Sequence, residues 1–192
     1  MMIDGLLHSL SAIEEANRNL GRTTLLQQLQ NGTSADRVRD SLNSIGLRST
    51  EEIEALYGWH DGIADTDAAI GRITLWPAFY FTSLEETVAN YRAFVDDARW
   101  TPGWLPLFAN GGGDFYVVDL STPGDTPIRL FLIDEDEHPI EFMSLTAMFA
   151  TLEEAFRRGC FYLTPEGVFR KDYPAFGKLA AEMNPDVAWW QS

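Results

Sequence analysis

The sequence contains a single cysteine, Cys160, and only three histidines, His8, His60 and His138. One cysteine cannot close a disulfide within the chain, and the paired spacing that holds structural zinc is missing. Cys160 lies just before two aromatic residues, a setting in which cysteine is usually a small buried hydrophobe. We therefore expect neither a structural metal ion nor a cofactor.

Long apolar runs are also missing. No stretch approaches the roughly 20 residues of a membrane span, and the first residues, MMIDGLLHSLSAIEE, lack a basic leader. We expect a soluble, cytoplasmic protein that makes no membrane contact. The 192 residues are 45% hydrophobic and 12% aromatic, which suits one domain with a substantial core.

Positive charge is scarce. The chain holds 14 Lys and Arg against 29 Asp and Glu, a formal charge of −15. The excess is concentrated, because 18 of the acids but only 4 of the bases lie between residues 51 and 150. Such a segment repels nucleic acid and attracts a basic partner. The alternative is a charge that only maintains solubility.

Hydrophobic spacing predicts helices first, strands in the middle and helices again at the end. Helices are expected over 1–30 with a break at Gly21, and over 34–45, 49–60, 84–95, 145–158 and 171–183. Ser49 with Glu52 and Ser83 with Glu86 have the spacing of capping boxes, and Ser144 is a further expected cap. Residues 70–81 are expected to be extended.

Four β-rich runs between residues 104 and 143 are separated by the short segments NGGG, TPGD and DEDEH. Connections this short favour an antiparallel meander. The predicted fold class is therefore α+β, a single domain with an antiparallel β-meander sheet packed against flanking helices.

The glycine cluster in WLPLFANGGGDFYVVDL invites comparison with phosphate-binding loops. Such loops lead from a strand into a helix and supply backbone or lysine donors. Here Gly111, Gly112 and Gly113 lead into a strand, and the nearest charge is the anion Asp114. The cluster is better explained as a hairpin turn with a bulge, in which Asn110 and the glycines adopt positive φ.

Catalytic patterns are weak. The run Asp134–Glu137 beside His138 lacks the glycine and distal glutamate of a helix-loop-helix Ca²⁺ site. Asp114 and Asp119 are an odd number of residues apart and face opposite sides of a strand. No GxSxG elbow is present. We predict no enzyme activity and no catalytic residues; the competing hypothesis is an enzyme that uses His60 with a nearby carboxylate, or a weak metal site at the DEDEH turn.

Two segments in order resemble a known family. They are LYGWHDG, residues 56–62, and WLP at 104–106 followed by NGGGD at 110–114 and a strand ending in VDL. The chain thereby resembles the SUKH superfamily, the Smi/Knr group named after yeast cell-wall assembly regulators. The resemblance covers about residues 30–158, which leaves an N-terminal helical extension, 1–30, and a C-terminal extension, 159–192. The motif positions expected to be structural are Trp59, Gly62, Trp104, Pro106, Gly111, Gly112, Gly113 and Asp114.

The resemblance implies an α+β domain without known catalysis. Bacterial members typically act as immunity proteins that bind and neutralise a toxin, often a nuclease, of a polymorphic or contact-dependent system. Fungal members resemble intracellular scaffolds, which is the alternative function. We expect a monomer or weak dimer whose partner is a basic cognate toxin or another protein. The candidate partner-binding residues are Asp61, Asp65, Asp67, Asp134, Glu135, Asp136 and Glu137.

Overall fold

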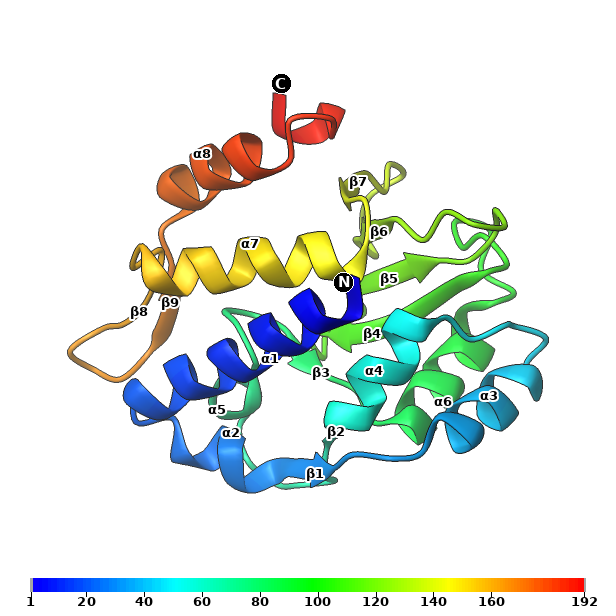
Figure 1. Cartoon of the computed structure of the whole chain (residues 1–192), viewed down its shortest axis with the longest axis horizontal. Helices are drawn as coiled ribbons and strands as arrows, with labels where there is room; N and C mark the ends of the chain where they lie inside the picture. The colour runs from blue at the N-terminus through cyan, green and yellow to red at the C-terminus, as the bar shows by residue number, and fades with distance from the viewer. Residues whose placement is uncertain (1, 192) are drawn as a thin grey trace.

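The computed structural model describes residues 2–191. The helices are α1 (Met2–Asn19), α2 (Thr23–Gln28), α3 (Ala35–Asn43), α4 (Glu51–Trp59), α5 (Ile70–Ile73), α6 (Leu84–Phe94), α7 (Leu145–Arg157), α8 (Tyr173–Met183) and the 3-10 helix η1 (Ala188–Gln191). The strands are β1 (Leu29–Asn31), β2 (His60–Ile63), β3 (Tyr80–Phe81), β4 (Trp104–Ala109), β5 (Phe115–Asp119), β6 (Ile128–Phe131), β7 (Ile140–Phe142), β8 (Phe161–Leu163) and β9 (Phe169–Lys171). Helices and antiparallel strands in one chain confirm the predicted α+β class (Figure 1).

The central sheet is a meander of five antiparallel strands in sequence order, β3-β4-β5-β6-β7. The predicted four-stranded meander is therefore confirmed, with β3 added at its edge. Both faces are covered. In β5, Tyr116 and Val118 belong to the main core, whereas Phe115 and Val117 belong to a second cluster on the opposite face. This alternation is the two-residue period of a strand.

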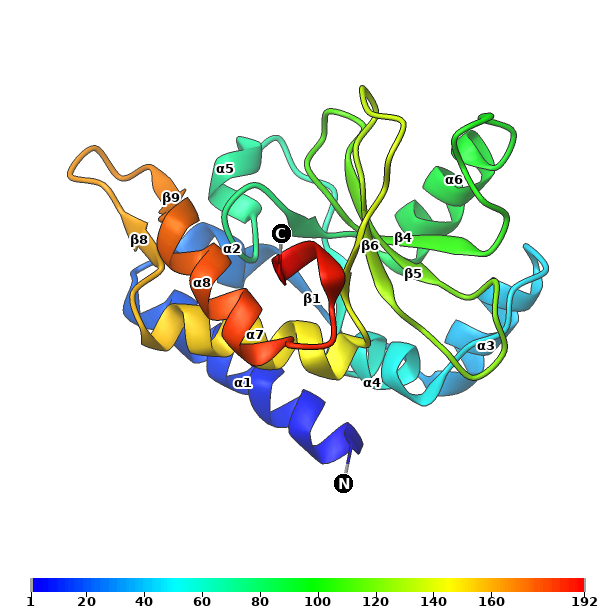
Figure 2. The same ribbon diagram turned by 90° about the horizontal axis from the view of Figure 1, so that it is seen from above.

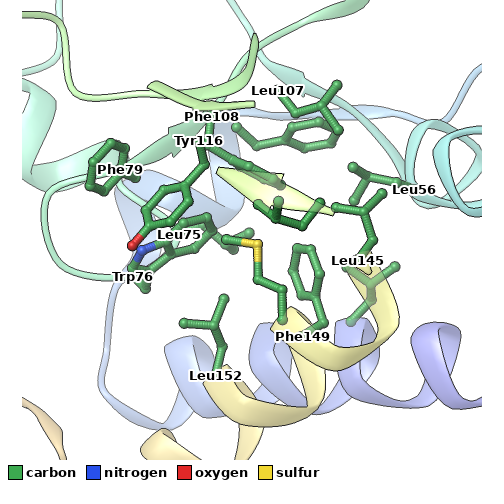
Figure 3. Close-up of a cluster of buried hydrophobic side chains, with 14 of the residues drawn as sticks. Leu56, Leu75, Trp76, Phe79, Leu107, Phe108, Tyr116, Leu145, Phe149 and Leu152 are labelled. Atoms are coloured by element: carbon green, nitrogen blue, oxygen red, sulfur yellow. The ribbon is translucent and has the colours of Figure 1, made fainter. Parts of the chain in front are cut away.

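Helix α7 covers the face of the sheet that bears the main core. Its Phe149 ring lies 5.8 Å from Phe108 and 6.3 Å from Trp76, and Figure 3 shows Leu145, Phe149 and Leu152 directed at the strand side chains. On the other face, Phe94 at the end of α6 packs 5.0 Å from Phe115. Helices α6 and α7 therefore flank the sheet from opposite sides (Figure 2). Burying each such aromatic ring contributes roughly 2–3 kcal/mol.

A bulge in β4 adjusts the register of the sheet. Pro106 pairs with Val117 and Phe108 with Tyr116, so Leu107 is the extra residue. Its carbonyl oxygen accepts hydrogen bonds from Thr82 N and Thr82 Oγ1 at 3.1 and 2.9 Å. The bulge leaves this carbonyl without a partner in β5, and the hydrogen bonds from Thr82 supply the partners that a buried carbonyl requires.

The capping box predicted at Ser49 and Glu52 is wrong. Thr50 is the N-cap of α4, accepting from Ile53 N at 3.3 Å. The carboxylate of Glu52 instead accepts from two amides in the first turn of α7, Leu145 N at 3.2 Å and Thr146 N at 3.0 Å. Glu52 thus joins α4 to a helix that lies far away in sequence. The caps expected at Ser83 and Ser144 are confirmed, since each hydroxyl accepts a hydrogen bond from the amide three residues on. The reciprocal half of the box predicted at Ser83 is not formed in the described chain, where the Glu86 carboxylate accepts from the Tyr80 hydroxyl instead.

The extended run predicted over residues 70–81 is only partly correct. Residues 70–73 form the short helix α5, and only Tyr80 and Phe81 pair in the sheet as β3. Between them, Leu75 N donates to Phe79 O at 2.8 Å across a tight turn in which Ala78 has φ +83°. From Ile73 onward the large apolar side chains of this segment are buried or half-buried, although most of the segment forms no sheet pairing. An apolar run looks the same in the sequence whether it is buried by pairing in a sheet or by packing as an irregular segment.

Helices α8 and η1 form a separate layer over α7 (Figure 1). The β8–β9 hairpin leads into α8, whose N-cap Asp172 accepts from Ala175 N. Helix η1 then reaches the edge strand β7, where Trp190 Nε1 donates to Glu141 O at 2.5 Å. The tail therefore covers part of a sheet edge that would otherwise expose backbone groups.

Candidate functional site

The LYGWHDG motif packs β2 closely against the start of α6. Asp61 Oδ1 accepts a hydrogen bond from Leu84 N at 2.8 Å, within the first turn of that helix. Gly62 has φ +65°, and a Cβ added there would lie 2.3 Å from Ser83 N and 2.4 Å from Thr82 C. Only glycine allows this close approach of two backbones. Trp59 stacks on Phe81, with ring centroids 6.4 Å apart, so the motif positions have structural contacts.

The NGGGD segment forms the turn between β4 and β5. Asn110 Oδ1 accepts from Gly112 N at 2.7 Å and Asp114 N at 3.1 Å, and Gly111 and Gly113 have positive φ. The predicted turn is therefore confirmed, whereas the positive φ expected at Asn110 and Gly112 is wrong. Asp114 faces the protein instead of a ligand, because its Oδ1 accepts from Ile133 N at 2.9 Å in the turn after β6.

The two outer glycines of this turn touch neighbouring segments. A Cβ at Gly111 would lie 2.3 Å from Ile70 Cδ1, and a Cβ at Gly113 would lie 2.8 Å from Ile133 Cδ1. The β4–β5 turn is thus held between α5 on one side and the β6–β7 turn on the other. All three lie along the same end of the sheet, towards the upper side of Figure 2.

The seven predicted partner-binding acids fall in three places. Asp61 is half-buried and caps α6. Asp65 and Asp67 are exposed in the segment before α5. The remaining four, which we call the acidic turn, are Asp134, Glu135, Asp136 and Glu137, and all are exposed between β6 and β7. The structure brings the second and third groups to opposite sides of the NGGGD turn, and their role in binding stays a prediction.

A groove of about 630 Å³ opens beside Asp65. It lies between the segment that follows β2 and the first turns of α6, and three carboxylates line it: Asp65, Glu85 and Glu86. No lysine or arginine of the described chain contributes to its wall. We call it the acidic groove. Uncompensated carboxylates in a concave site focus a negative potential that favours a cation.

Tyr80 forms part of the wall of the acidic groove. Its hydroxyl donates to Glu86 Oε1 at 2.7 Å. Burial and the adjacent Glu86 carboxylate raise the pKa of Tyr80 above its usual range, so the phenol stays neutral and holds Glu86 in position. Sequence reasoning assigned Glu85 and Glu86 only to helix capping. About 20 residues separate these glutamates from Asp65, and no sequence pattern predicts that residues so far apart line the same groove.

His60, the predicted alternative catalytic residue, links three elements. Its Nδ1 lies 2.6 Å from Gln30 O in β1, and its Nε2 lies 3.3 Å from Glu14 Oε2 in α1. A carbonyl can only accept, so Nδ1 carries a proton. Burial opposes ionisation of Glu14, but hydrogen bonds from His60 and Arg18 outweigh it and lower the pKa of that carboxyl. Both ring nitrogens of His60 are therefore engaged in joining α1 to the β1–β2 pair.

Cys160 is 3% exposed, and burial raises the pKa of its thiol. The interpretation of Cys160 as a buried hydrophobe is thus confirmed. Among residues 2–191, no cluster of three or more histidine, cysteine or carboxylate side chains has the geometry of a metal site. Within the same range, no helix is both long and apolar enough to cross a membrane.

The architecture defines a single-domain α+β protein built on an antiparallel meander, with a glycine-rich turn between two acidic surfaces. Its sequence matches the model of the SMI1 / KNR4 family (SUKH-1) over residues 24–157. The match spans more than half of the chain, so the protein belongs to this family, as the motifs indicated. A search of curated proteins found no match. The family is generally a non-catalytic immunity or regulatory domain and suggests protein–protein interaction.

Proposed function

We propose that this protein is an immunity protein that binds a basic toxin domain, such as a nuclease, and blocks it. Family membership supports a protein-binding role, and the observation that carries the proposal further is the acidic groove. Its wall offers Asp65, Glu85 and Glu86, and no lysine or arginine of the described chain lies in that wall. A lysine or arginine side chain of a partner complements the charge of such a groove.

The acidic turn extends the surface offered to this partner. Asp134–Glu137 are exposed and lie beyond the NGGGD turn from the groove. Several like charges along one end of the sheet raise the rate at which a basic protein associates, and the effect weakens with salt. Affinity comes from apolar contacts between the charges. Ile70, 42% exposed, lines the groove and lies next to Gly111, so it is placed to make such a contact.

Co-expression with the toxin encoded next to this protein tests the proposal. We expect growth to be rescued and the two proteins to co-purify as a salt-sensitive complex. The double variant Asp65→Lys/Glu85→Lys reverses two groove charges and should abolish rescue. The matched control, Glu51→Lys/Asp125→Lys, makes the same net change at exposed acids outside the groove and should retain it.

Equal rescue by both double variants would place the interface elsewhere and overturn the role of the acidic groove. Failure of the unmodified protein to rescue growth or to form a complex would overturn the immunity function. Circular dichroism of each variant establishes that it is folded before the growth assay is interpreted.

A further inference from the structure

A second groove lies on the other side of α5 and has the opposite charge. It has a volume of about 530 Å³ and runs between α5 and the β8–β9 hairpin. Arg72, Arg170 and Lys171 line it, and no carboxylate of the described chain does. Ile70 lines both grooves, so α5 is the ridge between them. In a chain of net charge −15, a groove lined by three cations and no carboxylate is a marked local exception, although the Glu141 carboxylate is close enough to Lys171 to interact with its charge. We call this site the cationic groove.

The two arginines of this groove are available to a ligand. Arg72 and Arg170 are exposed, and within residues 2–191 no ion pair joins either guanidinium to a carboxylate. Most other arginines are engaged: Arg18, Arg39, Arg99, Arg129, Arg157 and Arg158 all pair with acids. Because a guanidinium is charged at any physiological pH and binds carboxylates in a fork, Arg72 and Arg170 favour an anionic group.

Apolar and aromatic surface surrounds these cations. Val168 is 44% exposed and Tyr173 is 71% exposed, and both line the groove. The ammonium of Lys171 lies 4.6 Å from the centre of the Tyr173 ring. An aromatic ring held beside a cation and facing solvent is typical of a residue that anchors a partner. The groove therefore matches a ligand with both a carboxylate and an apolar side chain.

The buried side chain of Arg22 connects the two walls of the groove. Its Nη2 donates to Gly71 O at 3.0 Å, and Nη1 donates to Thr74 O. The same guanidinium lies 3.9 Å from the centre of the Phe169 ring in β9. Arg22 thus joins both walls, α5 and the β8–β9 hairpin. A groove held open in this way costs little reorganisation when a ligand binds.

We propose that the cationic groove binds an acidic peptide segment of a partner protein, in which an apolar side chain is flanked by aspartate or glutamate. A small molecule fits less well, because sites for small molecules enclose most of the ligand, whereas the groove's own residues Arg72, Arg170 and Tyr173 are exposed. A nucleic acid is disfavoured by the net charge of −15. This site is separate from the acidic groove and requires a partner surface of the opposite sign.

Titration calorimetry with a synthetic pentapeptide tests this inference. The probe has a central phenylalanine with two acidic residues on each side, and its control has the matching asparagine and glutamine. We expect the acidic probe to bind in the millimolar to micromolar range and the amide control at least about tenfold more weakly. Raising the salt concentration from about 0.05 M to about 0.3 M should weaken the acidic probe.

The variant Arg72→Glu/Arg170→Glu should weaken binding of the acidic probe at least about tenfold. The matched control Arg37→Glu/Arg48→Glu changes the net charge equally at exposed arginines outside the groove, and it should leave binding within about twofold. Equal binding of the two peptides, equal effects of the two variants, or no binding at millimolar peptide would each overturn the inference.

A second copy of the chain could also occupy the cationic groove, through its own acidic turn. Sedimentation analysis distinguishes this self-association from binding of a separate partner. Self-association that disappears in Arg72→Glu/Arg170→Glu would assign the groove to that contact and overturn the proposal of a separate partner. The growth assay with the toxin distinguishes the two proposals. We expect Arg72→Glu/Arg170→Glu to rescue growth as the unmodified protein does, even though it no longer binds the acidic peptide.

Discussion

Replacement of Gly62 by alanine tests whether the family motif stabilises the fold by holding β2 against the start of α6. Gly62 has φ +65°, so alanine pays the left-handed penalty of roughly 1–2 kcal/mol. The new Cβ would also lie 2.3 Å from Ser83 N and 2.5 Å from Thr82 O. Relieving this overlap with backbone atoms costs roughly 1–3 kcal/mol. It also moves Asp61 away from Leu84 N, a charge-assisted hydrogen bond that contributes roughly 1.5–3 kcal/mol.

These contributions predict a loss of at least about 3.5 kcal/mol, a large part of the roughly 5–15 kcal/mol that stabilises a typical domain. Gly46→Ala is the control, because Gly46 has φ +79° but no heavy atom within 4 Å of the added Cβ. It should lose only about 1–2 kcal/mol. Urea unfolding followed by tryptophan fluorescence measures both variants. A difference between them of less than about 1 kcal/mol would refute the close approach of β2 to α6.

Two further predictions concern glutamates that sequence patterns did not place. Glu52→Ala should lose about 1–2 kcal/mol in the same urea assay, because its carboxylate caps the first turn of α7. Its neighbour Glu51, which is exposed, should lose no more than about 0.5 kcal/mol as Glu51→Ala, and equal losses would contradict the cap. Burial raises the pKa of Glu141 above 4.5, despite opposing hydrogen bonds and the charge of Lys171. Above the pKa of the unfolded chain, the folded chain still holds a proton that the unfolded chain has released. The free energy of unfolding therefore falls as pH rises from the unfolded pKa of Glu141 towards its folded pKa. Between about pH 5 and about pH 8, Glu141→Gln should lose less stability than the unmodified chain, whereas the exposed control Asp125→Asn should follow the unmodified chain.

Local patterns predicted most of the fold because their physical causes are local. The meander follows from short apolar runs with turn residues between them, and the caps at Ser83 and Ser144 from hydroxyls three residues before a free amide. Glu52 shows where this reasoning stops. Its spacing from Ser49 fits a capping box, but its partners in α7 lie 93 and 94 residues away. Either arrangement satisfies the same backbone groups, and tertiary packing decides between them.

The grooves were beyond sequence reasoning for a related reason. Each is lined by segments that are distant along the chain: β2, α5 and α6 for the acidic groove, and α5 with the β8–β9 hairpin for the cationic groove. The sequence predicted exposed acids at Asp65 and at Asp134–Glu137, and they are exposed. It could not show that Glu85 and Glu86 share a wall with Asp65, because no periodicity relates a loop residue to the first turn of a later helix.

The position of Arg72 shows why charge counted along a sequence does not map directly onto a surface. Arg72 belongs to the acidic half of the chain, residues 51–150, which holds 18 of the 29 acids. Its side chain nevertheless lines the cationic groove with Arg170 and Lys171 from the C-terminal extension. The short helix α5 causes this separation, because it presents Ile70 to both grooves but Arg72 to only one. A partner that covers α5 from both sides therefore needs a basic group over the acidic groove, an acidic group over the cationic groove and an apolar contact with Ile70 between them. This requirement is stricter than the one that net charge alone imposes.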